Sequence, residues 1–251
     1  MKPCQSHLFY DQFKRKMVRV ENLDEMLVAY RQAADAGLDV MLQEIIPGDD
    51  THGVNYNAYV WEGQPLVEFT AEKVRNAPPW LGSPRVAISK AIPEVIEPGR
   101  AILNAMGFYG YSCSEFKRDA RDGVYKLMEV NGRHNLSSLL AVRCGVNFPW
   151  LQYQHLVHGE TPSARAADTG VYWIDFTRDV GYSAMYWRKE RYTLRQYLRP
   201  YLRPHVFAIW DRKDPRPFLR RCSHLVRVAF RSAFTALRGP RAKDRVVRQA
   251  S

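Results

Sequence analysis

Residues 114–133 read SEFKRDARDGVYKLMEVNGR, and this stretch is the most informative part of the chain. Two strand-like runs, 109–117 and 124–130, are joined around the turn residues 121–123 (RDG). Two such runs separated by a short loop that contains glycine are typical of an antiparallel β-hairpin. The length of that loop then decides which side chains share a face.

The expected loop sets the register of the hairpin. If residues 121–123 form a three-residue loop, with the glycine at the position of positive φ, Ala120 pairs with Val124. The same register places Glu115 directly opposite Glu129, with both carboxylates on one face. Two like charges at that distance repel unless one takes up a proton or a cation lies between them.

Further polar groups follow Glu129 along its strand. Because side chains alternate between the two faces, Asn131 and Arg133 share the face of Glu129 if the strand extends that far. Oxygen ligands of this kind suit Mg²⁺, which usually keeps some waters and takes further ligands from nucleotide phosphates. The alternative is an open hairpin face on which Glu115 and Glu129 are only solvated.

With these residues the sequence resembles the ATP-grasp superfamily, and within it the carboxylate-amine ligases with a carbamoyl-phosphate-synthase-like ATP-binding domain. In that family an acidic residue on one strand and a Glu-x-Asn-x-Arg pattern on the next bind the metal and the terminal phosphates. The resemblance implies that Glu115, Glu129 and Asn131 are metal ligands. It implies that Arg133 is the catalytic cation that stabilises the acyl phosphate and the transferring phosphoryl group, and that the cofactors are ATP and Mg²⁺ or Mn²⁺.

Two upstream segments fit the same resemblance. Residues 43–48 (QEIIPG) resemble the family's hinge strand, whose backbone meets the adenine, and Asp49 or Asp50 could reach the ribose. Lys2 resembles the phosphate-binding lysine that precedes this strand, although residues 4–14 contain no glycine of a phosphate loop. A core strand ending in a turn and a surface lysine are the ordinary alternatives. The residues expected to bind nucleotide are Lys2, Gln43, Glu44, Ile45, Ile46 and Asp49.

The carboxylate substrate has less specific candidates. Lys73, Arg75 and Arg85 flank a polar, proline-rich loop expected at residues 76–84. Arg75 is the best of them, because its guanidinium can bind a carboxylate through two parallel hydrogen bonds. Ordinary solvated charge is the alternative for Lys73 and Arg75 alike.

The periodicity of the rest predicts an α+β protein. Helices are expected at 22–36, in the second half of 87–106 and at 136–143, and strands at 16–20, 40–46, 55–61 and 66–70. Together with the resemblance, this predicts an ATP-grasp fold with a partial lid subdomain, a catalytic subdomain on an antiparallel sheet, and a basic tail. The expected boundaries are 1–52, 53–160 and 161–251.

The composition is that of a folded protein, with 46% hydrophobic and 25% charged residues. No apolar run approaches the roughly 18 residues of a membrane span, and the first residues do not lead into a signal-peptide core. We therefore expect a cytoplasmic protein. The cysteines form no CxxC pair, so that neither a zinc site nor a disulfide framework is predicted; they are Cys4, Cys113, Cys144 and Cys222.

The net charge of +11 belongs to the C-terminal region, where residues 185–251 contain 18 Lys and Arg against 4 Asp and Glu. Residues 219–237 have the pattern of a basic amphipathic helix, which could lie on an anionic membrane, contact nucleic acid, or pack its apolar side on the body. We consider nucleic acid the less favoured partner. Upstream, the aromatic-rich residues 172–176 and 182–187 are strand candidates.

The leading hypothesis is a ligase that uses ATP to convert a small-molecule carboxylate into an acyl phosphate, which an amine then attacks. The chain begins at the expected lysine, whereas the resembled enzymes have a preceding domain and further lid strands, so a truncated chain with little activity alone is expected. The alternatives are a non-catalytic remnant, a partner-requiring half of a split enzyme, and a basic membrane- or nucleic-acid-binding protein on that scaffold.

Overall fold

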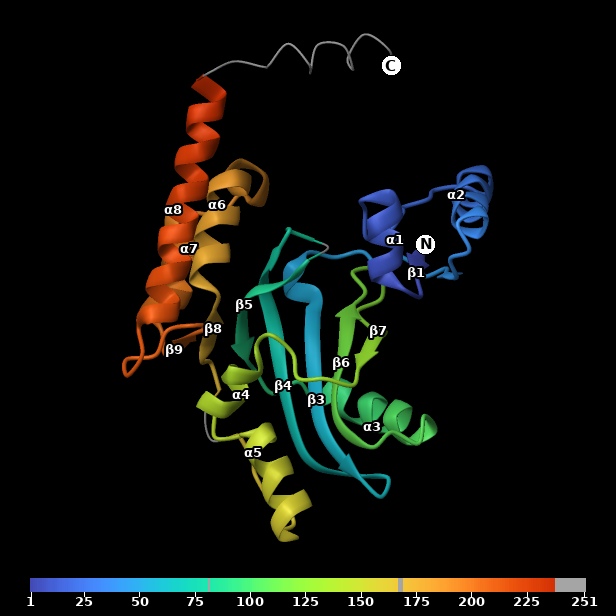
Figure 1. Cartoon of the computed structure of the whole chain (residues 1–251). Coiled ribbons are helices and arrows are strands. Elements are labelled where there is room, and N and C mark those ends of the chain that lie inside the picture. Colours follow the sequence, from blue (N-terminus) through green and yellow to red (C-terminus); the bar gives the residue numbers. More distant parts are fainter. Residues whose placement is uncertain (81, 167–168, 238–251) are drawn as a thin grey trace. The chain divides into compact units, whose positions relative to one another are not determined.

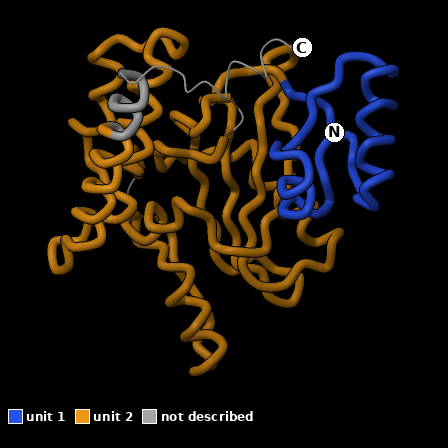
Figure 2. Tube along the Cα trace, turned by 45° about the horizontal axis from the view of Figure 1, so that its top comes forward, with its two compact units in different colours: residues 1–46 blue, residues 47–251 orange. Residues whose placement is uncertain are grey.

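The structure, a computed structural model, describes residues 1–80, 82–166 and 169–237 of the 251-residue chain (Figure 1). The chain divides into two compact units, residues 1–46 and residues 47–251, coloured separately in Figure 2. The first boundary thus lies before the expected position at residue 52. The region expected to be separate from residue 161 onward belongs to the same unit as the sheet.

The first unit contains two helices and a very short sheet. Strand β1 (Lys2–Pro3) pairs antiparallel with β2 (Val40–Met41), and helices α1 (Ser6–Phe13) and α2 (Leu23–Asp35) follow β1 in the chain. Helix α2 confirms the predicted helix, and the side chain of Asn22 caps it by accepting from the Glu25 amide. The core of this unit consists of Met1, Phe9, Ala29 and Ala33.

Both strands expected in the first unit differ from the prediction. The strand expected at residues 40–46 ends at Met41, because β1 has only two residues and offers no further pairing partner. The strand expected at 16–20 is absent from this described region. Val18 exchanges backbone hydrogen bonds with Met1 alone, so a single residue pair takes the place of a ladder.

The second unit is built on a seven-stranded sheet in the order β7-β6-β3-β4-β5-β8-β9. All neighbouring strands are antiparallel except β8 and β9, which are parallel. The α+β class is therefore confirmed. The strands are β3 (Gly53–Trp61), β4 (Gln64–Ala77), β5 (Ser83–Ser89), β6 (Gly110–Arg118), β7 (Tyr125–Asn131), β8 (Tyr172–Ile174) and β9 (His205–Phe207).

The first hairpin, β3–β4, is tighter and longer than expected. Its turn has only two residues, Glu62 and Gly63, both with positive φ, as a hairpin turn of mirror-image type requires. Strand β4 extends from the predicted end at residue 70 to Ala77, so it takes only the first two residues of the loop expected at 76–84, and β5, which was not predicted, takes its last two. Residues 78–82 alone connect them, since two prolines there cannot donate to a ladder.

Helices cover both faces of the sheet. One face packs Val54, Tyr56 and Ala58 of β3 against α3 (Ile96–Ala105), which confirms the helix expected in the second half of 87–106. The other face packs Tyr59 and Val67 against residues of α4 (Ser138–Arg143) and α5 (Phe148–Tyr153). A short π-helical turn, Gln154–His158, continues α5.

The C-terminal region adds strands and helices to the same unit. Helix α6 (Phe176–Glu190) follows β8, α7 (Leu194–Leu198) leads through a 3-10 turn to β9, and α8 (Arg216–Leu237) runs beside α6 (Figure 1). The strand expected at 182–187 is wrong. Those residues lie inside α6, which is capped by the Asp175 side chain and held by contacts to β4 and β5.

No helix in the described ranges combines the length and the apolar character needed to cross a bilayer.

Candidate functional site

Glu115 of β6 lies directly opposite Glu129 of β7, as predicted. The turn that produces this register is not the predicted one. The Asp119 amide donates to the Val124 carbonyl at 2.9 Å, so the loop has four residues, 120–123, and the strands start one residue out of the expected register. A β-bulge between Leu127 and Glu129 then restores it.

Asn131 lies two residues along β7 from Glu129, and its Nδ2 donates to Glu129 Oε1 at 2.9 Å. Asn131 pairs with Cys113 and is the last residue of the strand. The chain bends at Gly132 and Arg133, so the alternation that was expected to carry Arg133 onto the same face stops before it. Arg133 is exposed.

Lys73 of β4 reaches across β3 to form an ion pair with Glu115, and both side chains are largely buried. The stem of Lys73 passes over Gly53, where a Cβ would lie only 2.9 Å from Lys73 Cδ. A side chain at position 53 would therefore displace the stem of Lys73. The structure thus brings one of the two expected substrate residues to the carboxylate pair.

Lys117 is a further cation of this site that the sequence analysis missed. It lies two residues after Glu115 on β6 and pairs with Gly53, so its side chain shares the face of Glu115. Among the described residues its ammonium has neither a hydrogen bond nor an ion pair. Burial lowers the pKa of its ammonium, which lies near the charges of Asp50 and Asp49. Its spacing from Glu115 on a predicted strand was the signal that could have found it.

Arg75 is engaged within the fold, which argues against its expected role as a substrate ligand. Its Nε and Nη2 donate to the two carboxylate oxygens of Asp179 at 2.8 and 2.7 Å, and its side chain is 1% exposed. Arg85 is also buried and donates to Asp179 and Glu190. A bulge between Lys73 and Arg75 breaks the alternation of β4, so the two residues have different surroundings.

Buried amides extend the row of Glu129 and Glu115 into the sheet. Asn55 of β3 pairs with Glu115 and is 2% exposed, and its Oδ1 has no hydrogen-bond partner among the described residues. Next to it, Asn57 Oδ1 accepts from Tyr111 and from Asn135 at 2.8 and 2.9 Å. The sequence analysis missed these amides, because nothing in their local pattern distinguishes them from strand residues.

Cys113 lies in the same buried surroundings. The Asn135 amide contacts its sulfur at 3.2 Å. Burial, with the negative charge of Glu115 as a second cause, raises the pKa of its thiol to about 12. This thiol is therefore protonated and unsuited to act as a nucleophile or metal ligand.

The residues expected to bind the nucleotide outside the carboxylate pair are divided between the two units. In the first unit, Lys2 on β1 pairs with Met41, Gln43 is half-buried, Glu44 and Ile45 are exposed, and Ile46 is buried. In the second unit, Asp49 caps a 3-10 turn and accepts from Thr51 and His52.

Asp49 and Asp50 have different environments. Burial opposes the ionisation of Asp49, but hydrogen bonds from Thr51 and His52 outweigh it and lower the pKa of the carboxyl. Asp50 is buried and accepts from the amides of Asn76 and Trp80 at 2.8 and 2.7 Å. Of the two acids considered for the ribose, Asp49 is thus the exposed one.

The oxygen atoms at the carboxylate pair suit a hard cation that also binds water and phosphate. Within the described ranges no three His, Cys, Asp or Glu side chains form a metal cluster. Glu115 and Glu129 supply carboxylate oxygens, and Asn131 keeps its amide oxygen after donating through Nδ2. Two or three protein oxygens completed by phosphate and water are the arrangement that Mg²⁺ favours.

Comparison with known proteins supports the resemblance. No protein-family model matches the chain. Over 145 residues the chain is 28% identical to a D-aspartate ligase from Enterococcus faecium (strain Aus0004), a match that covers 53% of this chain and 33% of the relative. The expected resemblance to ATP-grasp ligases is confirmed. The matched part spans about a third of the length of this curated relative.

Three solved structures share part of the fold. A biotin carboxylase from Campylobacter jejuni has a TM-score of 0.44 at 13% identity, over 59% of this chain and 34% of that chain. An L-amino acid ligase from Bacillus licheniformis has a TM-score of 0.41 at 19% identity, over 59% and 40%. The biotin carboxylase domain of 2-oxoglutarate carboxylase from Hydrogenobacter thermophilus has a TM-score of 0.42 at 17% identity, over 59% and 35%.

Proposed function

We propose that this chain supplies the catalytic unit of an ATP- and Mg²⁺-dependent ligase that joins a carboxylate to an amine. The observation that carries the proposal is the cross-strand pair of Glu115 and Glu129, with Asn131 beside it and Lys73 reaching into it. Carboxylates placed together on one face without a structural need are a feature of sites that bind a cation.

In this proposal Glu115, Glu129 and Asn131 hold Mg²⁺, with Mn²⁺ as a substitute. The bound ion supplies charge neutralisation for the phosphates of ATP. Lys73 and Lys117 lie next to the acidic pair and would neutralise the oxygens of the transferring phosphoryl group or of the substrate carboxylate. Arg133 keeps the role that the resemblance implies, from an exposed bend at the end of the strand.

The proposed reaction has two steps. An oxygen of the substrate carboxylate attacks the γ-phosphorus of ATP, the bond to the β-phosphate oxygen breaks, and ADP leaves. The nitrogen of the amine then attacks the acyl carbon, phosphate leaves with the bonding electron pair, and the nitrogen loses a proton to solvent to give the amide. Positioning and charge neutralisation account for most of the catalysis of phosphoryl transfer. Side chains supported by a rigid sheet suit that task.

The similarity to a D-aspartate ligase supports an amino acid as one of the two substrates. Because the matched part is about a third of that relative, both substrates remain part of the proposal. The use of ATP fits a cytoplasmic location, which we propose for the chain.

A non-catalytic remnant is the less favoured alternative. Decay would be expected to remove the acidic pair or its supporting cation, yet Glu115, Glu129 and Lys73 form one connected group. A split enzyme that requires a partner chain would use the same residues, and the binding test below applies to both.

Isothermal titration calorimetry with ATP tests the proposal. We expect binding that requires Mg²⁺ and that falls at least tenfold in Glu129→Gln and in Asn131→Ala. Glu62→Gln serves as the matched control, because Glu62 lies exposed in the β3–β4 turn. ATP binding that needs no metal, or that is equal in all four proteins, would contradict the proposed function.

A further inference from the structure

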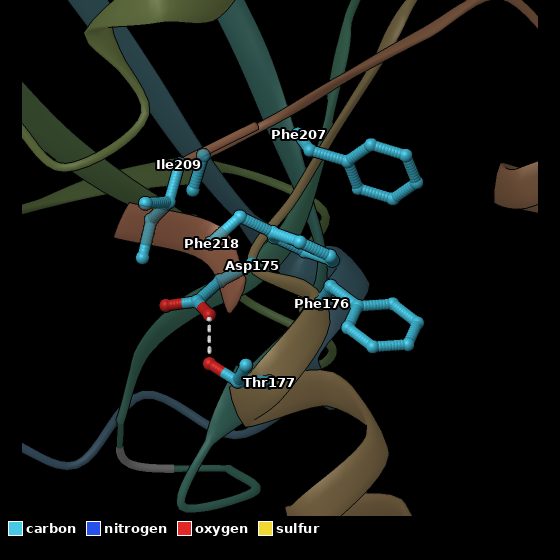
Figure 3. Close-up of a pocket in the computed structure, with 7 residues that line it drawn as sticks. Asp175, Phe176, Thr177, Phe207, Ile209 and Phe218 are labelled. Atoms are coloured by element: carbon cyan, nitrogen blue, oxygen red, sulfur yellow. Dashed lines mark hydrogen bonds between the residues drawn. The ribbon is translucent and has the colours of Figure 1, made fainter. Parts of the chain in front are cut away.

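Helix α8 has an inner side that is already occupied by the protein. Phe218, near its start, contacts the ring of Phe176 with centroids 5.6 Å apart, and both line a small pocket with Phe207 (Figure 3). One turn further, Arg221 Nε donates to Thr177 Oγ1 at 3.2 Å. Packing of this helix on the body, one of the three alternatives that the sequence left open, is therefore present along its inner side.

The packing continues along α6. Leu225 lies on the same side of α8 as Cys222, and its Cδ1 is 3.6 Å from the position of a Cβ on Gly181. Cys222 and Leu225 are half-buried. The inner side of α8 thus consists of Phe218, Cys222 and Leu225, and α6 covers it.

A second apolar row lies on the outer side of α8. Leu219, Val226 and Phe230 are 58%, 52% and 71% exposed. Their spacing of seven and four residues places them on one line along the helix. Among the described residues this row belongs to none of the hydrophobic core clusters, so burial in the core does not account for its apolar character.

Arginines run along one edge of this outer row. Arg216, Arg220 and Arg227 are exposed, and each lies one or three residues from a member of the row. The helix sequence contains no aspartate or glutamate. An apolar line bordered by cations, with no acidic residue on the helix, complements a surface that is anionic outside and apolar beneath. We propose that the outer side of α8 lies on the anionic surface of a lipid membrane, parallel to it and without crossing it.

The physical basis is the combination of both kinds of side chain. Each arginine near an anionic lipid surface contributes about fivefold to binding, while the apolar side chains enter the boundary between headgroups and acyl chains. Either the arginines or the apolar side chains alone would give only weak, reversible attachment, and the outer side of α8 carries both. A nucleic acid would use the arginines but would leave Leu219 and Val226 in water.

Sedimentation with lipid vesicles tests this proposal on the full chain. We expect binding to vesicles of equal parts phosphatidylglycerol and phosphatidylcholine and none to phosphatidylcholine alone. The triple variant Leu219→Ser, Val226→Ser, Phe230→Ser should lose at least tenfold in affinity. The triple variant Arg216→Gln, Arg220→Gln, Arg227→Gln should lose about a hundredfold, with the largest loss at low salt.

Val228→Ser is the matched control, because Val228 is 45% exposed but lies on the opposite side of the helix from the row. It should bind vesicles as the unaltered chain does. Circular dichroism of each variant verifies that α8 still forms. Vesicle binding that is insensitive to the apolar triple variant, or reduced equally by Val228→Ser, would overturn the proposal. Binding to duplex DNA with an affinity that only the arginine variant lowers would replace it by a polyanion site.

Discussion

Glu115 faces Glu129 directly across β6 and β7, and the counter-charge for this pair comes from Lys73, two strands away in the sheet. The protein thereby carries its own cation at the proposed metal site. A divalent ion at the pair has to compete with this ammonium for Glu115, whereas the side chains of Glu129 and Asn131 bond to each other.

Lys73→Met should tighten the binding of Mn²⁺ in the absence of nucleotide by about fivefold to tenfold, because it leaves the carboxylates without a competing cation. Electron paramagnetic resonance of free Mn²⁺ measures this affinity. Lys90→Met is the matched control, since Lys90 forms an ion pair with Glu72 outside the acidic pair. Unchanged or weaker Mn²⁺ binding in Lys73→Met would show that Lys73 does not compete with the metal.

Gly53→Ala should act through Lys73. The added Cβ would lie 2.9 Å from Lys73 Cδ, so the flexible lysine stem has to move away from Glu115. We expect Mn²⁺ binding to tighten as in Lys73→Met, and the free energy of unfolding to change by less than about 1 kcal/mol. In the double variant the two effects should not add.

Gly181→Ala, which places a Cβ at ordinary contact distance inside α6, controls for the effect of the substitution itself. It should leave Mn²⁺ binding unchanged and be neutral or stabilising by roughly 1 kcal/mol. Full additivity of Gly53→Ala and Lys73→Met would mean that the glycine acts by another route.

Lys117→Met should stabilise the fold while it weakens the binding of ATP with Mg²⁺. The folded state pays for desolvating an ammonium that has no ion-pair partner among the described residues, and methionine removes that charge. Urea denaturation and calorimetry give the two quantities. A loss of stability in this variant would contradict the assignment of Lys117 as a binding group held in an unfavourable environment.

The same residue predicts a pH dependence. Burial lowers the pKa of Lys117, so its charge is lost at a lower pH than that of an ordinary lysine. Affinity for the anionic nucleotide should therefore fall as pH rises through this lowered pKa, and Lys117→Met should lack that part of the decrease. A decrease of equal size in both proteins would assign it to another group.

Arg75→Met should lower the free energy of unfolding and should have no direct effect on substrate binding. The substitution removes one of the two arginines that neutralise the buried Asp179. Breaking such a buried pair costs about 3 kcal/mol or more, measured as the free energy of unfolding in urea. Lys73→Met should cost less than Arg75→Met, because its partner Glu115 keeps 22% of its side chain exposed whereas Asp179 is fully buried. A stable Arg75→Met protein with impaired substrate binding would restore the role expected from the sequence.

Local pattern was enough to predict several features of this protein. Helix α2 follows from its cap at Asn22 and its apolar periodicity, and the β6–β7 hairpin follows from two strand-like runs around a glycine turn. The pairing of Glu115 with Glu129 was also correct. The predicted loop was wrong, but the pairing was right because two shifts cancel: the four-residue loop moves the register by one residue, and the bulge moves it back.

Contacts between distant parts of the chain decided the rest. Lys73 and Arg75 look equivalent in sequence, yet the bulge between them sends one to Glu115 and the other to Asp179, which is more than a hundred residues away. Residues 182–187 have strand-like aromatic content, but the cap at Asp175 and packing against β4 and β5 make them helical. Sequence pattern placed Glu115 and Glu129 on neighbouring strands, and the bulge in β7 brought them opposite each other. Which cations reach these acids follows from contacts between strands, because it depends on strand order, on the bulge in β4 and on the absence of a Cβ at Gly53, where the stem of Lys73 passes.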